Sequence, residues 1–89
     1  MAEQEIPYDA IIRTEVAIKI LNEARAIVTA RVYELEEQDP PAAEQLRERR
    51  RGLLDLQERL EADAPDAVED VIAVWGPRVK DELRFWAEF

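Results

Sequence analysis

The stretch Leu35-Glu36-Glu37-Gln38-Asp39-Pro40-Pro41 separates two long segments that both carry apolar residues at helical spacing. Aspartate is a preferred helix N-cap and proline is favoured at the first helical position, so a helix is predicted to begin at Pro40 with Asp39 as its cap. A connection this short makes consecutive helices antiparallel neighbours. The sequence therefore predicts an antiparallel helical hairpin formed by residues 9–37 and 40–62.

Proline also marks the start of the other expected helices. The first helix follows Pro7-Tyr8-Asp9, with Asp9 as its expected N-cap, and residues 1–8 are expected to form a flexible N-terminus. The sequence Asp63-Ala64-Pro65 repeats the pattern before a third helix, expected over residues 65–75.

Gly76 and Pro77 lie inside the last helical pattern of the chain. Because proline cannot donate a backbone hydrogen bond to the preceding turn, the third helix is expected to break near Gly76, with a last helix over residues 77–88. The chain has only two glycines, and its prolines fall where helices would begin. Residues 1–89 are therefore predicted to form a single all-α domain, a small helical bundle.

The apolar residues of the first helix cover an unusually wide arc. On a helical wheel the arc spans roughly 180–200°, wider than the stripe of a helix with one neighbour, so this helix is expected to be central. The second helix has a narrower leucine seam of the coiled-coil type. The residues of the wide arc are Ile12, Val16, Ile20, Leu21, Ala24, Ile27, Val28, Val32 and Leu35.

Ile11 and Ile18 fall outside even that arc, so another element must cover them. One interpretation is that the C-terminal segment folds back over the first helix. The preferred interpretation is a homodimer, because small bundles gain core area by association. The expected oligomer interface comprises Ile11, Ile18, Arg13 and Arg31.

Arg13 and Arg31 are 18 residues apart, so both project in the same direction, into the apolar arc of the first helix. A buried guanidinium group needs a paired carboxylate, from another helix or from a second subunit. The alternative is that the aliphatic stems cover the core while the charged ends reach water.

The composition removes most catalytic and metal chemistry. The chain has no Cys, His or Ser, so disulfides, thiolate or imidazole ligands, Ser and Cys nucleophiles and a histidine base are all absent. Nothing in the spacing of the carboxylates indicates a catalytic pair in a cleft. The chain is therefore expected not to be an enzyme and to bind neither a metal nor another cofactor.

The charge balance argues against nucleic acid. Twelve Lys and Arg against 21 Asp and Glu give a net charge of −9, whereas phosphate binding needs the opposite sign. The only basic cluster is Arg47-Glu48-Arg49-Arg50-Arg51. It is expected to be compensated by acids three or four residues away, and nucleic-acid binding through Arg47–Arg51 is the less favoured alternative. These acids are Glu44, Glu48, Asp55 and Glu58.

The C-terminal third carries two candidate partner-binding features. Asp66, Glu69 and Asp70 could enter a basic site on another protein, or could serve only as helix-start and solubility charges. Val79, Leu83 and Trp86 share a face that can serve the core. Phe85 and Phe89 share another face near Arg78 and are interpreted as exposed anchors, unless this tail folds onto the first helix.

These features predict a non-catalytic protein–protein interaction module. Ten arginines against two lysines are compatible with a GC-rich bacterial genome, and a small acidic accessory or regulatory protein of bacterial or mobile-element origin is expected. It would act as an inhibitor, antitoxin or immunity-type binder of a basic partner. The alternative is an assembly adaptor that binds through the apolar first helix and the C-terminal aromatics. No apolar run is long enough to span a membrane, so a cytoplasmic location is expected.

Overall fold

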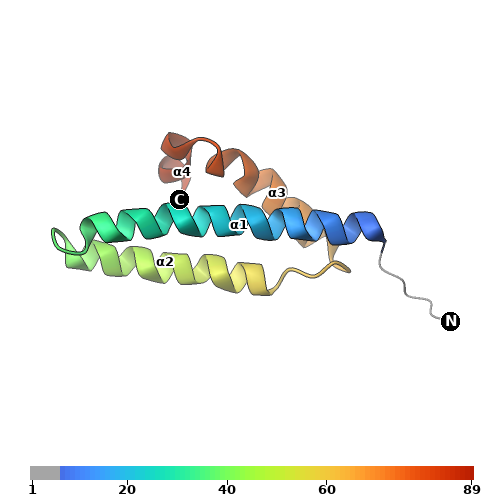
Figure 1. Ribbon diagram of the computed structural model, residues 1–89, viewed down its shortest axis with the longest axis horizontal. Helices are drawn as coiled ribbons and strands as arrows, with labels where there is room; N and C mark the ends of the chain where they lie inside the picture. The colour runs from blue at the N-terminus through green and yellow to red at the C-terminus, as the bar shows by residue number, and fades with distance from the viewer. Residues whose placement is uncertain (1–6) are drawn as a thin grey trace.

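A computed structural model describes residues 7–89 and contains four helices, with no strand in this range (Figure 1). The helices are α1 (Tyr8–Leu35), α2 (Pro40–Glu58), α3 (Pro65–Val79) and α4 (Glu82–Glu88). The predicted all-α class and the small helical bundle are therefore confirmed.

Helix α1 lies at the centre, with α2 along one side and α3 along another (Figure 1). Its contacts with α2 run in opposite sequence order, because Glu36 pairs with Arg47 whereas Thr29 pairs with Arg50. Its contacts with α3 run in the same order. Arg13 binds Glu69, and Ile20 lies beside Gly76. The expectation of a central first helix with at least two neighbours is confirmed.

The core is a single cluster shared by all four helices. Helix α1 contributes small side chains, Ala17 and Ala24, at fully buried positions, which lets the neighbouring helices approach closely. The large and fully buried side chains are Phe85, Leu21, Val28, Val32 and Val68.

Ile12 and Val16 were expected on the core side of α1, but each is 38% exposed. Thr14 and Ala17 are buried instead, and the Thr14 hydroxyl donates to the carbonyl oxygen of Ala10 at 2.8 Å. The reason is that α1 extends past the end of α2, so its first turns face only the beginning of α3 and the connection before it (Figure 1). The helical wheel therefore predicts the buried face correctly for the middle of α1 but not for its N-terminal end.

The helix starts at Pro40 and Pro65 agree with the sequence, and the Asp39 side chain accepts from the Ala42 backbone N–H at 3.3 Å. The first helix differs, because its N-cap is Pro7 rather than Asp9 and no side chain caps it. It begins at Tyr8, within the expected flexible segment; residues 1–6 lie outside the described residues. Helix α2 ends at Glu58 rather than near residue 62, and the chain leaves the helix so that Leu60 enters the core.

The expected break near Gly76 is wrong. Helix α3 continues through Gly76 and Pro77 to Val79, and the interruption falls at Lys80 and Asp81. Pro77 is exposed, and so is the residue four positions earlier, so the missing backbone bond lies on the solvent side of α3, where it costs least. Asp81 then begins α4, because its carboxylate accepts from the Arg84 backbone N–H at 3.3 Å.

Candidate functional site

The three acids predicted to bind a partner lie at the beginning of α3, and one of them is already used. The Glu69 carboxylate accepts two hydrogen bonds from Arg13, at 2.8 Å from Nε and 2.7 Å from Nη2. These bonds lower the pKa of Glu69 and raise that of Arg13. Asp66 and Asp70 are exposed and form no ion pair within residues 7–89. The acidic surface available to a partner is therefore Asp66 and Asp70.

The four residues of the expected oligomer interface do not form one surface. Arg13 points to α3, where it binds Glu69, and Arg31 pairs with Glu34 of its own helix at 2.9 Å. Both guanidinium groups are exposed rather than buried, as the alternative interpretation required. Ile18 is half-buried and packs against the core, whereas Ile11 remains 40% exposed.

Exposed apolar side chains gather at the N-terminal end of α1. We call this set the N-terminal patch; its members and their exposed fractions are Tyr8 75%, Ile11 40%, Ile12 38% and Val16 38%. They fall within nine residues of the sequence, on the part of α1 that α2 does not reach (Figure 1). Single exposed apolar residues are ordinary, but four of them within nine residues favour a binding surface.

The Arg13–Glu69 ion pair joins the N-terminal patch to the acidic start of α3. Val16 lies three residues after Arg13, and Asp66 lies three residues before Glu69, so each shares a helix face with one member of the pair. The Glu69 carboxylate, bound to Arg13, therefore lies at one border of the patch. An apolar centre with a charged border is the usual anatomy of a protein-binding surface.

The C-terminal aromatic anchors are corrected by the structure. Phe85 is fully buried, and its ring centroid lies 5.1 Å from that of Phe89 and 6.2 Å from that of Trp75. Leu83, expected in the core, is 87% exposed. The sequence predicts one continuous helix over residues 77–88, but the interruption at Lys80 and Asp81 changes the direction in which the later side chains point. The alternative, a tail folded onto the first helix, is correct in that these aromatics pack inside the subunit, but their ring partners include Trp75 of α3, and Arg49 of α2 covers Phe89.

Arginines hold this aromatic cluster in place. The Arg49 guanidinium lies 4.3 Å from the centroid of the Phe89 ring, and that of Arg78 lies 4.8 Å from Trp75. Arg78 also donates to Glu88 at 2.8 Å, and this bond lowers the pKa of the Glu88 carboxyl. Arg78 and Phe89 are thus engaged within the subunit.

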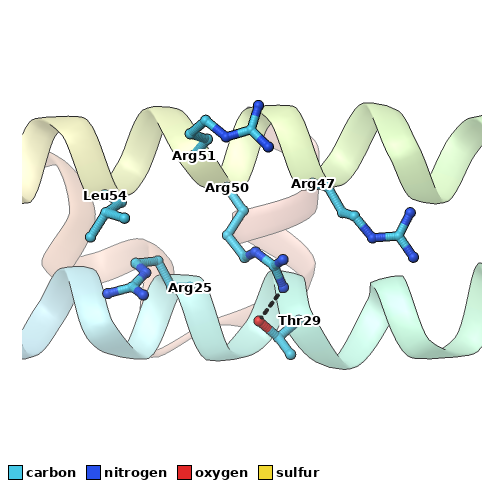
Figure 2. Close-up of a pocket in the computed structure, with 6 residues that line it drawn as sticks. All are labelled: Arg25, Thr29, Arg47, Arg50, Arg51 and Leu54. Carbon is cyan, nitrogen blue, oxygen red and sulfur yellow. Dashed lines mark hydrogen bonds between the residues drawn. The ribbon is translucent and has the colours of Figure 1, made fainter.

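The basic cluster of α2 borders a groove between α1 and α2 (Figure 2). Arg47 binds Glu36 at 2.8 Å and Glu44 at 3.1 Å, as the sequence predicted for Glu44. Glu48, Asp55 and Glu58 form no ion pair within residues 7–89, so the expected compensation is incomplete.

Arg25 and Thr29 of α1 complete this groove, and they were missed by reasoning from the sequence. Thr29 lies seven residues before the 36–39 connection, whereas Arg50 lies eleven residues after it. A symmetric alignment of the two helices about that connection would therefore not have paired them, and neither residue of α1 belongs to a motif.

Within residues 7–89, no group of three or more carboxylates is placed to hold a metal ion. None of the helices in this range combines the length and the hydropathy needed to cross a bilayer. Comparisons with protein-family models, with curated proteins and with solved structures find no match to this chain.

Proposed function

We propose that this chain is a non-catalytic protein–protein interaction module that binds a basic partner through the N-terminal patch and its acidic border. The observation that carries the proposal is the exposure of four large apolar side chains over the first turns of α1. We also propose that α1 and α2 form an antiparallel hairpin, which the reversed order of their contacts favours.

Charge complementarity indicates the chemistry of the partner. The chain carries a net charge of −9, and Asp66 and Asp70 are exposed acids on α3, the helix whose Glu69 binds Arg13 beside the patch. A partner with an apolar centre and a basic border would gain both hydrophobic burial and attraction between the borders. Such a surface suits an inhibitor, antitoxin or immunity-type protein that covers a basic site.

The adaptor alternative relies on the same patch without the carboxylates. It loses its second feature, because Phe85 is buried and Phe89 packs inside the subunit. Homodimer formation would also bury the patch, but two copies would then bring like charges together. We therefore favour a basic protein over a second copy.

Two exposed tyrosines on α1 offer a matched test. Tyr8 belongs to the patch and is 75% exposed, whereas Tyr33 lies near the other end of α1 and is 70% exposed. Each is replaced in turn by a photo-reactive phenylalanine derivative, and the purified chain is irradiated in an extract of the native host. We expect a discrete adduct from position 8 and none from position 33.

The chemistry of the contact is then tested by variants. Ile12→Asp should abolish the adduct, and Asp66→Lys with Asp70→Lys should weaken it, more strongly at low salt. An adduct of twice the chain mass, together with a dimer in sedimentation equilibrium, would replace the basic partner by a second copy. Equal labelling from positions 8 and 33 would contradict the proposal, and insensitivity to the double lysine variant would favour the adaptor.

A further inference from the structure

The groove between α1 and α2 has an unusual lining for an acidic protein. It has a volume of about 290 Å³, and no carboxylate lines it. Figure 2 shows Arg50 reaching from α2 toward Thr29 of α1, with Arg25 on one side and Arg47 on the other. The lining residues are Arg25, Thr29, Arg47, Arg50, Arg51 and Leu54.

Three of the four guanidinium groups lack a carboxylate partner within residues 7–89. Arg50 donates to the neutral Thr29 hydroxyl at 2.9 Å. Arg25 donates to the side-chain oxygens of Asn22 at 3.2 Å and Gln57 at 3.3 Å. Arg51 forms no ion pair in this range. Only Arg47 is neutralised, by Glu36 and Glu44.

Two groups that line the groove have hydrogen-bonding capacity that the described residues do not use. Arg25 is half-buried, and its Nε is buried without a hydrogen-bond partner among the described residues. The Thr29 hydroxyl accepts from Arg50, so its own hydrogen is available to donate. Guanidinium groups match the spacing of phosphate and carboxylate oxygens, and clustered cations attract an anion that relieves their mutual repulsion.

We propose that this groove binds the phosphate group of a small soluble molecule, with Arg25, Arg50 and Arg51 supplying the charge and Thr29 a hydroxyl donor. Its volume is close to the lower end of ordinary ligand pockets, which fits a small ligand. A nucleic acid fits poorly, because Glu36 and Glu44 flank Arg47 at one side of the groove and the whole chain is acidic. The site lies further along α1 than the N-terminal patch, so it is independent of the proposed function.

Isothermal titration with inorganic phosphate and with pyrophosphate tests this site in the full chain. Ionic strength is held constant with sodium chloride, so that a general salt effect cancels. We expect saturable binding at one site, tighter for pyrophosphate, and a loss of about tenfold or more in Arg50→Gln. Thr29→Val should weaken binding less, because it removes a single neutral donor.

Arg59→Gln is the matched control, since Arg59 is exposed near the end of α2 and, among residues 7–89, its side chain donates to the Asp55 carbonyl oxygen rather than to a carboxylate. It should bind pyrophosphate as the unmodified chain does. Arg51→Gln removes an exposed groove charge with no bonded partner in the structure, and so weakens binding even if Arg50→Gln fails to fold. Absence of saturable binding by the unmodified chain, or equal losses in the Arg59 and Arg51 variants, would overturn the proposal.

Two further arms separate the sources of the phosphate group. Vesicles containing phosphatidic acid and a short DNA duplex are each titrated with and without pyrophosphate. The soluble-ligand proposal expects weak binding of both. Tight binding of either one that pyrophosphate does not displace would overturn it in favour of a lipid surface or a nucleic acid.

Discussion

The N-terminal end of α1 and the C-terminal helix α4 both carry large apolar side chains, but only α4 has one of them fully buried. Both carry several large apolar side chains within nine residues or fewer. Phe85 of α4 is fully buried within the aromatic cluster, whereas the N-terminal patch of α1 remains exposed. The difference lies in the neighbouring helices, because α4 packs against the bundle while the N-terminal end of α1 extends past the end of α2 (Figure 1). In so small a domain, the burial of a side chain depends on how far the neighbouring helices extend. Composition alone does not reveal that length.

The largest effect in this comparison is expected from a cavity made in the core beneath α4. Phe85→Ala should lower the free energy of unfolding by about 3–5 kcal/mol, since it removes a fully buried ring and leaves a cavity. Urea unfolding followed by circular dichroism measures the change. Leu83→Ala is the control in the same helix, because Leu83 is 87% exposed, and it should shift stability by less than about 0.5 kcal/mol. Equal losses in the two variants would contradict the described orientation of α4.

The ion pair between the N-terminal end of α1 and α3 should respond to acid. The Arg13 hydrogen bonds lower the folded-state pKa of Glu69 below its ordinary 4.5. The stabilisation from this pair is therefore complete above pH 4.5 and is lost as the pH falls through the lowered value.

Glu69→Gln should reduce the loss of stability on acidification, and the effect should be smaller than that of Phe85→Ala because the pair is exposed. Arg13→Gln should reproduce it, since either change removes the same pair. Unfolding free energies measured on both sides of this pH range supply the test. An acid dependence identical to that of the unmodified chain would contradict an intact pair in solution.

The smallest effect is expected at the N-terminal patch. Tyr8→Ala should change the free energy of unfolding by less than about 0.5 kcal/mol, because Tyr8 is already 75% exposed. The same urea titration, repeated at two protein concentrations, measures it. A loss of several times that size, or a midpoint that depends on concentration, would show that something covers the patch.

The local signals of the fold could be taken from the sequence. Asp39, Pro40 and Pro65 act on the backbone within a single turn, so they place the starts of α2 and α3 correctly. Pro77 was misleading, because the cost of proline in a helix depends on whether that side faces solvent, which is a tertiary property. The break at Asp81 then set the direction of every later side chain.

The surfaces of the molecule were harder to predict from the sequence than its helix starts. A helical wheel gives the angles between residues of α1 but not how far along the helix its neighbours extend, so Ile12 and Val16 were assigned to the core. Glu69 was recognised as part of an acidic cluster, but its partner Arg13 is 56 residues away. Arg25 and Thr29 carry no motif and become notable only beside Arg50.

The shared direction of α1 and α3 has a consequence for the order of assembly. Helices α1 and α2 are consecutive and can meet as soon as residue 58 has been made. The opposite side of α1 waits until α3 has been completed at Val79. During synthesis the Ile20 side of α1 therefore stays open for a further 21 residues, which is when a chaperone or a neighbouring nascent chain could reach it. The core is completed only when α3 and α4 pack onto α1, so the topology determines how long this side of α1 stays exposed during synthesis.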